Sequence, residues 1–310
     1  MRAAQIKSYG GVEVIEINEN APAPVPTENQ ILVEVYAAGV NPVDWKIREG
    51  FLKEMIPLNF PATLGGDFAG KVSALGEGVV DFQIGDEVFG QASTMHGGSF
   101  AEFAIASTSS ASSKPKNTDY TTAAALPLAG VSAVQAVIDH INLASGQKIL
   151  IHGGAGGIGS MAIQIAKNLG AFVATTVSAN DVDYAKKMGA DSVIDYKSQK
   201  FEDVVKDFDA VFDTAGGDNP KRSVSIIKKG GILVSMAGGV DEELAKTHGI
   251  TAISQMTQIT KARLEKLSEF IDSGVKVNVE KIFPLSEAAQ ALDYLKNTPP
   301  KGKIVLKIKD

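Results

Sequence analysis

The sequence predicts an α/β protein in which an all-β unit is followed by a doubly wound parallel sheet. Over the first hundred or so residues, short apolar segments are separated by Gly, Pro, Asn or Asp. This pattern is typical of antiparallel strands. From about residue 120, strand-like segments alternate with helical ones. Such alternation indicates βαβ units and a parallel sheet.

The β-rich unit is predicted from short, often alternating segments. The expected strands cover residues 12–17, 30–37, 69–76, 86–90 and 99–106. Within the second of them, Ile31, Val33 and Val35 fall on one face and the residues between them on the other. Period-two spacing of this kind predicts a strand with one buried face. A short helix is expected over 43–50.

The second unit is predicted from strands and helices that alternate. The expected strands cover 148–153, 172–177, 192–196, 208–216 and 232–238, and the expected helices cover 157–170, 181–189 and 219–231. The tail predicts a strand over 278–285, a helix over 286–297 and a strand over 303–308, and this last strand fits either sheet.

The boundary between the units is expected near a Ser-rich segment, 107–117, which we interpret as a solvated loop. We expect a first domain over 1–122, completed by 277–310, and a second domain over 123–276.

Composition and charge exclude several classes of protein. With 310 residues, 44% of them hydrophobic, the chain can bury more than one core. The net charge of −6 is spread along the chain, so nothing indicates binding to nucleic acid or to an anionic membrane. The amino terminus has no apolar signal segment, and no apolar run is long enough to span a membrane, so we expect a cytoplasmic protein.

Metal sites built on Cys or His are not expected either. The chain has no cysteine. Its four histidines lack the spacing of metal ligands; they are His96, His140, His152 and His248.

A glycine-rich turn is the strongest functional motif. The segment GGAGGIG (153–159) satisfies G-x-G-x-x-G, follows an expected strand and opens an expected helix. The first glycine permits a tight turn, the next lets backbone approach a pyrophosphate, and the last lets helix pack on strand. The helix N-terminus offers free N–H groups to the anion. We predict dinucleotide binding by Gly154, Ala155, Gly156, Gly157, Ile158 and Gly159.

The residue after the second strand of this unit favours NADPH over NADH. An NAD site places an Asp or Glu about 20 residues after the glycines, on the ribose 2′-hydroxyl. Ser178 stands there, and a hydroxyl accepts a 2′-phosphate that a carboxylate would repel. Asn180 and Lys186 are predicted to assist, and Tyr196 to pack on the adenine. Asp181 lies close by and no arginine does, which counts against this preference.

Tyr196 and Lys200 also match the YxxxK pair of short-chain dehydrogenases. In that family the glycine turn lies near the amino terminus, and the pair lies far downstream on a long helix. Here the turn is in the middle of the chain and Tyr196 ends an expected strand. We therefore interpret the match as coincidental.

The chain also resembles a known family over essentially its whole length. The segments that carry the resemblance are NPVDWKIREG (41–50), LGGDFAGKVSALGEGVVDFQIGDEVFG (64–90), GGSFAEFA (97–104), AALPLAGVSAVQAV (124–137), ILIHGGAGGIGSMAIQIAK (149–167) and MGADSVIDY (188–196), together with the tail. They resemble the medium-chain dehydrogenase/reductase superfamily, in its zinc-free quinone oxidoreductase branch and near the alkenal/enone oxidoreductases. The resemblance implies a GroES-like, β-barrel-type catalytic domain and a Rossmann domain.

The resemblance also bears on a metal. Zinc-dependent members of the superfamily carry Cys in the position of Asn41 and His-Glu in the positions of Gly66 and Asp67. A catalytic zinc needs three His, Cys or carboxylate donors, and the replacements in this chain do not supply them. We predict no metal, and we interpret Asp67 as a buried carboxylate that binds neighbouring backbone.

The missing Lewis acid restricts the reaction. Zinc polarises a carbonyl oxygen, so hydride transfer to a simple carbonyl is poorly supported without it. A quinone or an α,β-unsaturated ketone or aldehyde spreads the developing charge onto a remote oxygen, and needs only orientation and a hydrogen-bond donor. We predict an NADPH-dependent quinone or enone reductase.

The resemblance implies roles for particular side chains. Asn41, Asp44 and Lys46 are assigned to the catalytic side of the site, with Lys46 donating to the substrate oxygen or to the nicotinamide ribose. Ser132 is assigned to the nicotinamide. Asp44 has a second interpretation, as a cap of the helix over 43–50.

Two alternative functions stay open. The same fold supports a non-enzymatic NADPH-binding sensor or structural protein. Enoyl-thioester reductases use a tyrosine soon after the NPxD stretch, and no tyrosine occurs over 46–60. Segment 249–254 has the character of an exposed edge strand, through which two copies would pair as a homodimer.

Overall fold

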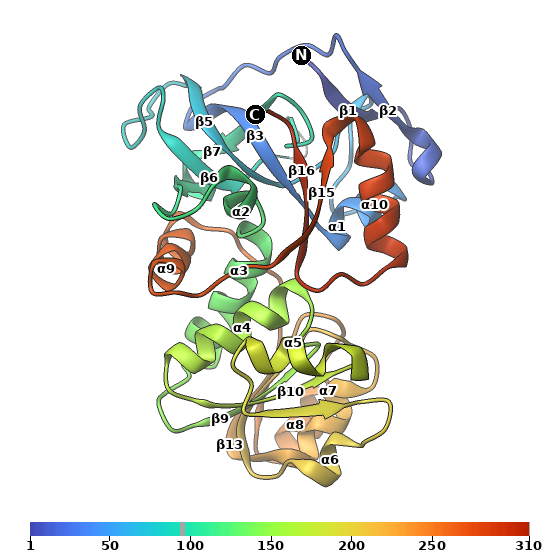
Figure 1. Cartoon of the computed structure of the whole chain (residues 1–310), viewed down its shortest axis with the longest axis vertical. Helices are drawn as coiled ribbons and strands as arrows, with labels where there is room; N and C mark the ends of the chain where they lie inside the picture. Colours follow the sequence, from blue (N-terminus) through green and yellow to red (C-terminus); the bar gives the residue numbers. More distant parts are fainter. Residues whose placement is uncertain (94–96, 310) are drawn as a thin grey trace. The chain divides into compact units, whose positions relative to one another are not determined.

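The computed structural model describes residues 1–93 and 97–309. They form two compact units (Figure 1). The first contains Met1–Leu128, Ile259–Asp272 and the chain from Val277 onward, and the second contains Ala129–Gln258 and Ser273–Lys276. This packing groups 123–128 and 259–272 with the first unit, whereas the sequence-based boundaries place them in the second domain. Those domain boundaries remain a prediction.

The first unit is built on two sheets. One has seven strands, in the order β15-β16-β3-β5-β6-β8 with β7 also paired to β3, and the other has three, in the order β2-β1-β4. The strands are β1 (Ala3–Ile6), β2 (Ile15–Asn18), β3 (Gln30–Val40), β4 (Ala62–Thr63), β5 (Asp67–Leu75), β6 (Glu87–Gln91), β7 (Phe103–Ser107), β8 (Ala111–Ser113), β15 (Val279–Pro284) and β16 (Lys303–Lys307). The helices are α1 (Pro42–Arg48), α2 (Tyr120–Ala124), α9 (Lys261–Asp272) and α10 (Ala288–Asn297).

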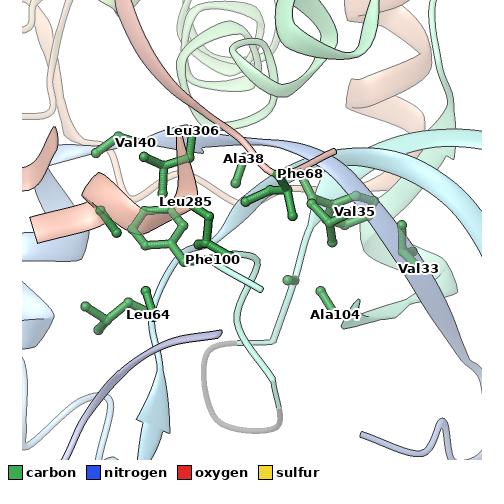
Figure 2. Packing of buried hydrophobic residues seen from close by; sticks show 14 of the residues in the cluster. Val33, Val35, Ala38, Val40, Leu64, Phe68, Phe100, Ala104, Leu285 and Leu306 are labelled. Atoms are coloured by element: carbon green, nitrogen blue, oxygen red, sulfur yellow. The ribbon is translucent and has the colours of Figure 1, made fainter. Parts of the chain in front are cut away.

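Strand β3 is the centre of this unit. Ile31, Val33 and Val35 are at most 1% exposed, which confirms the predicted alternation. Figure 2 shows side chains of β3 packed with Phe68 and Phe100 in the core. The strand is long enough for its first half to pair with β7 and its second half with β16.

The carboxy-terminal segment completes the same sheet. Strand β16 runs antiparallel to β3, β15 runs parallel to β16, and α10 packs on both of these strands (Figure 1). The helix buries Ala288, Ala291 and Leu292. The sequence left the final strand open between two sheets, and the structure places it in the β-rich one.

The second unit is a doubly wound sheet. Its six strands lie in the order β11-β10-β9-β12-β13-β14, and all the neighbouring pairs are parallel. The strands are β9 (Lys148–His152), β10 (Phe172–Val177), β11 (Ser192–Asp195), β12 (Phe208–Asp213), β13 (Ile227–Ser235) and β14 (Thr251–Ser254). The helices are α4 (Gly157–Asn168), α5 (Val182–Lys187), α6 (Phe201–Val204), α7 (Asn219–Ser223) and α8 (Glu242–Thr247).

This strand order fixes where a ligand is expected. The chain order reverses between β9 and β12, and ligands bind such sheets at that point, beyond the carboxyl ends of the strands. Helices α4 and α5 pack against β9, β10 and β11, whereas α7 and α8 pack against β12, β13 and β14 (Figure 1). Helix α3 (Pro127–Val134) continues as a π-helix, Gln135–His140. The fold class predicted from the sequence is confirmed.

Some predicted elements are wrong. The helix expected over 219–231 ends at Ser223, and β13 begins at Ile227, so its second half is strand. The Ser-rich segment contains β8, which pairs with β6 and is not simply a solvated loop. Strand β1 was not predicted. Strand β14 does form an edge of its sheet, as expected for 249–254. No helix in 1–93 and 97–309 combines the length and apolar character needed to cross a membrane.

Candidate functional site

The glycine turn follows β9 and opens α4 in the second unit. Gly153 has a φ of +79°, a left-handed conformation that favours glycine. A Cβ on Gly154 would lie 2.1 Å from Thr175 Oγ1, and one on Gly159 would lie 2.2 Å from Gly153 O. These two glycines are therefore required by the packing of the turn itself.

Gly156 differs from its neighbours because its packing does not require glycine. A Cβ there would meet nothing nearer than Gly153 O, at 3.5 Å. Gly156 is also the N-cap of α4, and no side chain caps this twelve-residue helix. The first N–H groups of α4 are thus left without the usual side-chain acceptor, which is the chemistry that binds a pyrophosphate.

The residues predicted to bind the 2′-phosphate and adenine lie at the ends of β10 and β11. The backbone N–H of Tyr196 donates to Val177 O at 3.1 Å, so Tyr196 and Ser178 are brought together. Tyr196 is 58% exposed, and Lys186 is exposed on α5. Ser178 Oγ donates to Asp181 Oδ2 at 2.5 Å. The hydroxyl predicted to meet a 2′-phosphate is therefore paired with a carboxylate.

Asn180 lies in the short turn between Ser178 and α5. Ser132 is placed on α3 and is fully buried. Its Oγ lies 2.7 Å from Thr257 Oγ1, and its carbonyl accepts from Gln255 Nε2 at 3.0 Å. Its assignment to the nicotinamide remains a prediction.

Asn41 and Asp44 begin helix α1 in the first unit. Asn41 is the N-cap, and its backbone N–H donates to Asp44 Oδ2 at 2.7 Å. This is one half of a capping box, so the interpretation of Asp44 as a capping residue is confirmed. Burial raises the pKa of Asp44 to about 7, and the nearby carboxylate of Asp67 adds to the rise. Asp44 thus carries a proton for part of the time near neutral pH.

The Asn41 amide bonds at both ends. Its Nδ2 donates to Asp67 Oδ2 at 2.9 Å. Its Oδ1 accepts from Lys303 Nζ, which also donates to Val40 O at 3.0 Å. Asn41, Asp44, Asp67 and Lys303, here called the Lys303 cluster, are all at most 5% exposed.

Asp67 is held by backbone as well as by Asn41. Its Oδ2 accepts from the backbone N–H of Leu128 at 3.1 Å, 61 residues away in the sequence. The predicted bond to backbone is present, although the backbone is distant rather than neighbouring. Burial raises the pKa of Asp67, and Lys303 opposes that rise.

Lys46 lies apart from this cluster. It is exposed on α1, and its Nζ lies 5.7 Å from the centroid of the Trp45 ring. An exposed ammonium at an aromatic ring is available to a ligand. Of the three predicted catalytic residues, Asn41 and Asp44 are therefore buried, and Lys46 is exposed.

The residues present do not fit a catalytic zinc. Asn41 offers an amide that is bonded at both ends, and Gly66 offers no donor. A Cβ on Gly66 would meet nothing nearer than Gln91 Nε2, at 3.7 Å, so the backbone leaves space for a larger side chain there. Within 1–93 and 97–309, no group of three or more His, Asp, Glu or Cys side chains is placed to hold a metal ion. His96 lies outside these residues.

Two features were missed by sequence reasoning. Lys303 lies 262 residues from Asn41 in the sequence, and no local pattern marks it as buried. His152, at the end of β9, bonds Thr176 Oγ1 at 2.9 Å and Ser223 Oγ at 3.0 Å. A lone histidine at the end of an apolar strand was the available signal for this second network.

A cavity of about 810 Å³ lies elsewhere on the first unit. It is lined by residues of β3, β7, β15 and β16 and of the chain that follows β16. It contains none of the predicted site residues. Its charged side chains include the pairs Arg2–Glu102 and Lys309–Glu34.

Comparisons with known proteins agree with the two-unit architecture. Residues 27–116 match the family described as "Alcohol dehydrogenase GroES-like domain", and residues 188–306 match "Zinc-binding dehydrogenase". The NADPH-dependent alkenal/one oxidoreductase of Arabidopsis thaliana chloroplasts is 36% identical over 318 residues, covering 99% of this chain and 79% of that protein.

Solved structures give the same result. The quinone oxidoreductase of Coxiella burnetii has a TM-score of 0.91 and 34% identity, covering 100% of this chain and 99% of that one. Escherichia coli quinone oxidoreductase complexed with NADPH has a TM-score of 0.87 and 29% identity, covering 99% and 100%. The chain therefore belongs to the medium-chain dehydrogenase/reductase superfamily, among its quinone and alkenal oxidoreductases.

Proposed function

We propose that this chain is an NADPH-dependent oxidoreductase that transfers hydride to a quinone or to an α,β-unsaturated carbonyl compound without a metal. The relatives named above carry out reactions of this class or bind NADPH. The Lys303 cluster is the observation that carries the proposal. It places Asn41 and Asp67, which stand where the resemblance implies Cys and Glu in zinc-dependent members, in hydrogen bonds with each other and, through Asn41, with Lys303.

The cofactor would supply the hydride from its nicotinamide ring. The open N-terminus of α4 and the turn Gly154–Gly159 would hold its pyrophosphate. Ser178, Asn180 and Lys186 would receive the 2′-phosphate, and the exposed ring of Tyr196 would pack on the adenine. Ser132 would contact the nicotinamide.

The acceptor is restricted because, within residues 1–93 and 97–309, no group of side chains is placed to hold a metal ion as a Lewis acid. A conjugated acceptor takes up hydride at carbon and develops negative charge on a remote oxygen, so a hydrogen-bond donor is sufficient to stabilise it, and solvent or a weak acid then supplies the proton that completes the reduction. Lys46 is the proposed donor, to that oxygen or to the nicotinamide ribose. Asn41 and Asp44 act by fixing the start of α1, because their hydrogen bonds are internal to the fold.

Turnover with a substrate panel tests the proposal. Purified protein with NADPH should lose the absorbance of the reduced cofactor when a quinone, an alkenal or an enone is added. NADH should serve less well, and an enoyl-thioester should be a poorer substrate. NADPH binding without turnover of any acceptor would instead identify a non-enzymatic binding protein.

Assembly and location complete the proposal. Strand β14 is an edge of its sheet, and exposed edges pair readily with a second copy. We therefore place a homodimer contact there, which sedimentation or light scattering would test. We also propose a cytoplasmic location, which fractionation of cells would test.

A further inference from the structure

Lys303 is a buried cation that the proposed hydride transfer does not use. It begins β16, is 5% exposed, and donates to Val40 O and to Asn41 Oδ1. Burying an ammonium ion costs several kcal/mol unless acceptors and opposite charges surround it. Burial lowers the pKa of Lys303, and Asp67 and Asp44 oppose that change. Its retention in the core indicates that these carboxylates require its charge.

The two carboxylates of the cluster are incompletely bonded. Each uses one oxygen: Asp44 Oδ2 accepts from the Asn41 backbone, and Asp67 Oδ2 accepts from the Asn41 side chain and from Leu128. Asp44 Oδ1 and Asp67 Oδ1 are buried and have no hydrogen-bond partner in the structure. Two such carboxylates repel one another in a low-dielectric interior unless a cation or a proton compensates them.

We propose that Lys303 is a built-in cation that takes the place of a metal ion in this chain. Residue 41 bonds the ammonium of Lys303, and residue 67 bonds residue 41. By the family resemblance, zinc-dependent members of the superfamily carry Cys at the first of these positions and the Glu of His-Glu at the second. The ammonium offsets one unit of the negative charge of Asp67 and Asp44 and orients the Asn41 amide. It also excludes a divalent cation, which like-charge repulsion would disfavour.

The backbone delivers the ammonium to this place. Gly302 has a φ of +98°, and a Cβ on it would lie 2.2 Å from Asn278 O. The N–H of Lys303 donates to Asn278 O at 2.8 Å. Ile304 then pairs with Val40, which sets Lys303 beside the junction of β3 and α1. The position of the charge is thus built into the sheet.

Three variants separate this role from ordinary packing. Lys303→Met removes the charge and retains an unbranched apolar chain. Lys307→Met makes the same change at an exposed lysine of the same strand and serves as the matched control. Lys303→Met/Asp67→Asn removes one negative charge together with the positive one. Fluorescence of Trp45, the only tryptophan, reports unfolding of the unit that holds the cluster.

The proposal predicts a defined order of stability. Lys303→Met should lower the urea midpoint well below that of Lys307→Met, and the added Asp67→Asn should restore part of the loss. Addition of MnCl₂, a cation suited to carboxylate and carbonyl oxygens, should raise the thermal midpoint of Lys303→Met by about 3 °C or more. It should leave wild type, Lys307→Met and the double variant unchanged.

Three results would overturn the inference. They are a wild-type midpoint that rises with MnCl₂, a Lys303→Met variant as stable as Lys307→Met, and a response to MnCl₂ that Asp67→Asn does not abolish. If Lys303→Met fails to fold without the metal, the folding of Lys303→Met/Asp67→Asn tests the inference instead. A double variant that folds supports the inference, and a double variant that fails to fold while Lys307→Met folds contradicts it. None of these readouts uses NADPH or a substrate, so they stand apart from the proposed reaction.

Discussion

Two glycine-rich segments, GGAGGIG in the second unit and LGGDFAG in the first unit, are alike in composition but differ in whether their polar groups are free to bind a ligand. In GGAGGIG, Gly156 begins α4 with no side-chain cap, and its packing leaves space around it. In the other, Gly66 also has space around it, but Asp67 is bonded to Asn41 and Leu128. The uncapped N–H groups of α4 can bind an anionic ligand, whereas the Asp67 carboxylate already accepts hydrogen bonds from within the fold.

The cluster in the first unit should be the more sensitive of the two regions. Asp67→Ala leaves Lys303 facing one carboxylate and leaves the Leu128 N–H unpaired. We expect a loss of about 3–5 kcal/mol in the free energy of unfolding, the usual effect of leaving a buried charge without its compensating charge. Urea unfolding measures it.

Asp81→Ala is the control for this change. Asp81 pairs with Lys261 at 2.9 Å at the surface, where its side chain is 55% exposed. Such pairs contribute about 1 kcal/mol or less. Equal effects of the two substitutions would show that the buried cluster contributes no more to the free energy of unfolding than a surface ion pair.

The two units should respond to pH in opposite directions. Burial lowers the pKa of His152 to about 4 from 6.5, against the pull of Asp213. As the pH drops from 6.5 to about 4, the unfolded chain binds a proton at His152 and the folded chain does not. The free energy of unfolding therefore falls by at most about 3 kcal/mol over this range. Asp44 holds a proton in the fold that the unfolded chain has released between 3.8 and about 7. Its contribution to stability therefore falls as the pH rises.

Conservative variants separate these two slopes. His152→Gln keeps hydrogen-bonding groups and does not titrate, so it should flatten the loss on the acid side. Asp44→Asn keeps an acceptor for the Asn41 backbone and should flatten the change toward neutral pH. Urea midpoints measured from pH 4 to pH 8 test both. Unchanged slopes in both variants would contradict the assignment of the two groups.

The glycine turn should show its role in binding rather than in stability. Gly156→Ala adds a methyl group where the fold has space, so the thermal midpoint of unfolding should equal that of wild type. NADPH affinity should fall about tenfold or more, which corresponds to about 1.4 kcal/mol. Titration of the protein with NADPH by fluorescence or calorimetry measures the change.

Gly159→Ala and Gly238→Ala are the comparison variants for Gly156→Ala. A Cβ on Gly159 would meet Gly153 O at 2.2 Å, so both stability and affinity should fall. A Cβ on Gly238 meets nothing within 4 Å and should change neither. An affinity for NADPH that survives in Gly156→Ala would move the pyrophosphate away from this turn.

The smallest expected effect concerns the choice of cofactor. Ser178 Oγ donates to Asp181 Oδ2 at 2.5 Å, so a negative charge lies where a 2′-phosphate is proposed. Asp181→Asn removes that charge and should raise the preference for NADPH over NADH by about three- to tenfold. Asp183→Asn, an exposed carboxylate on α5, is the control. The ratio of kcat/KM for the two cofactors measures it, and a ratio that falls or stays constant would count against the proposed 2′-phosphate site.

Local patterns in the sequence predicted much of the architecture. Strand and helix periodicity gave the parallel sheet and the buried face of β3, because both depend on residues near one another in the chain. The same reasoning failed over 227–231, where the polar segment KKGG follows two isoleucines and looks like the end of a helix. Ile227 pairs with Phe208 of β12 and, after a shift of register, Ile232 pairs with Ala210, and this pairing is a tertiary contact.

The buried polar cluster could be predicted only in part. Asn41 and Asp44 were singled out through the family resemblance, and Asp67 through the segment LGGDFAG read against that family. Lys303 was not, since a lysine at the start of an apolar strand looks the same whether it is buried or, like Lys307, exposed. The pairing of Ser178 with Asp181 was also missed, because proximity in sequence does not tell which atoms a hydroxyl meets.

Turnover by metal-free protein tests metal-independent hydride transfer most directly. Protein dialysed against EDTA should oxidise NADPH with 1,4-benzoquinone or 3-buten-2-one at the rate of untreated protein, and added ZnCl₂ should not increase that rate. Activity that disappears on dialysis and returns with one equivalent of metal would contradict the proposed reaction and the role of Lys303 together.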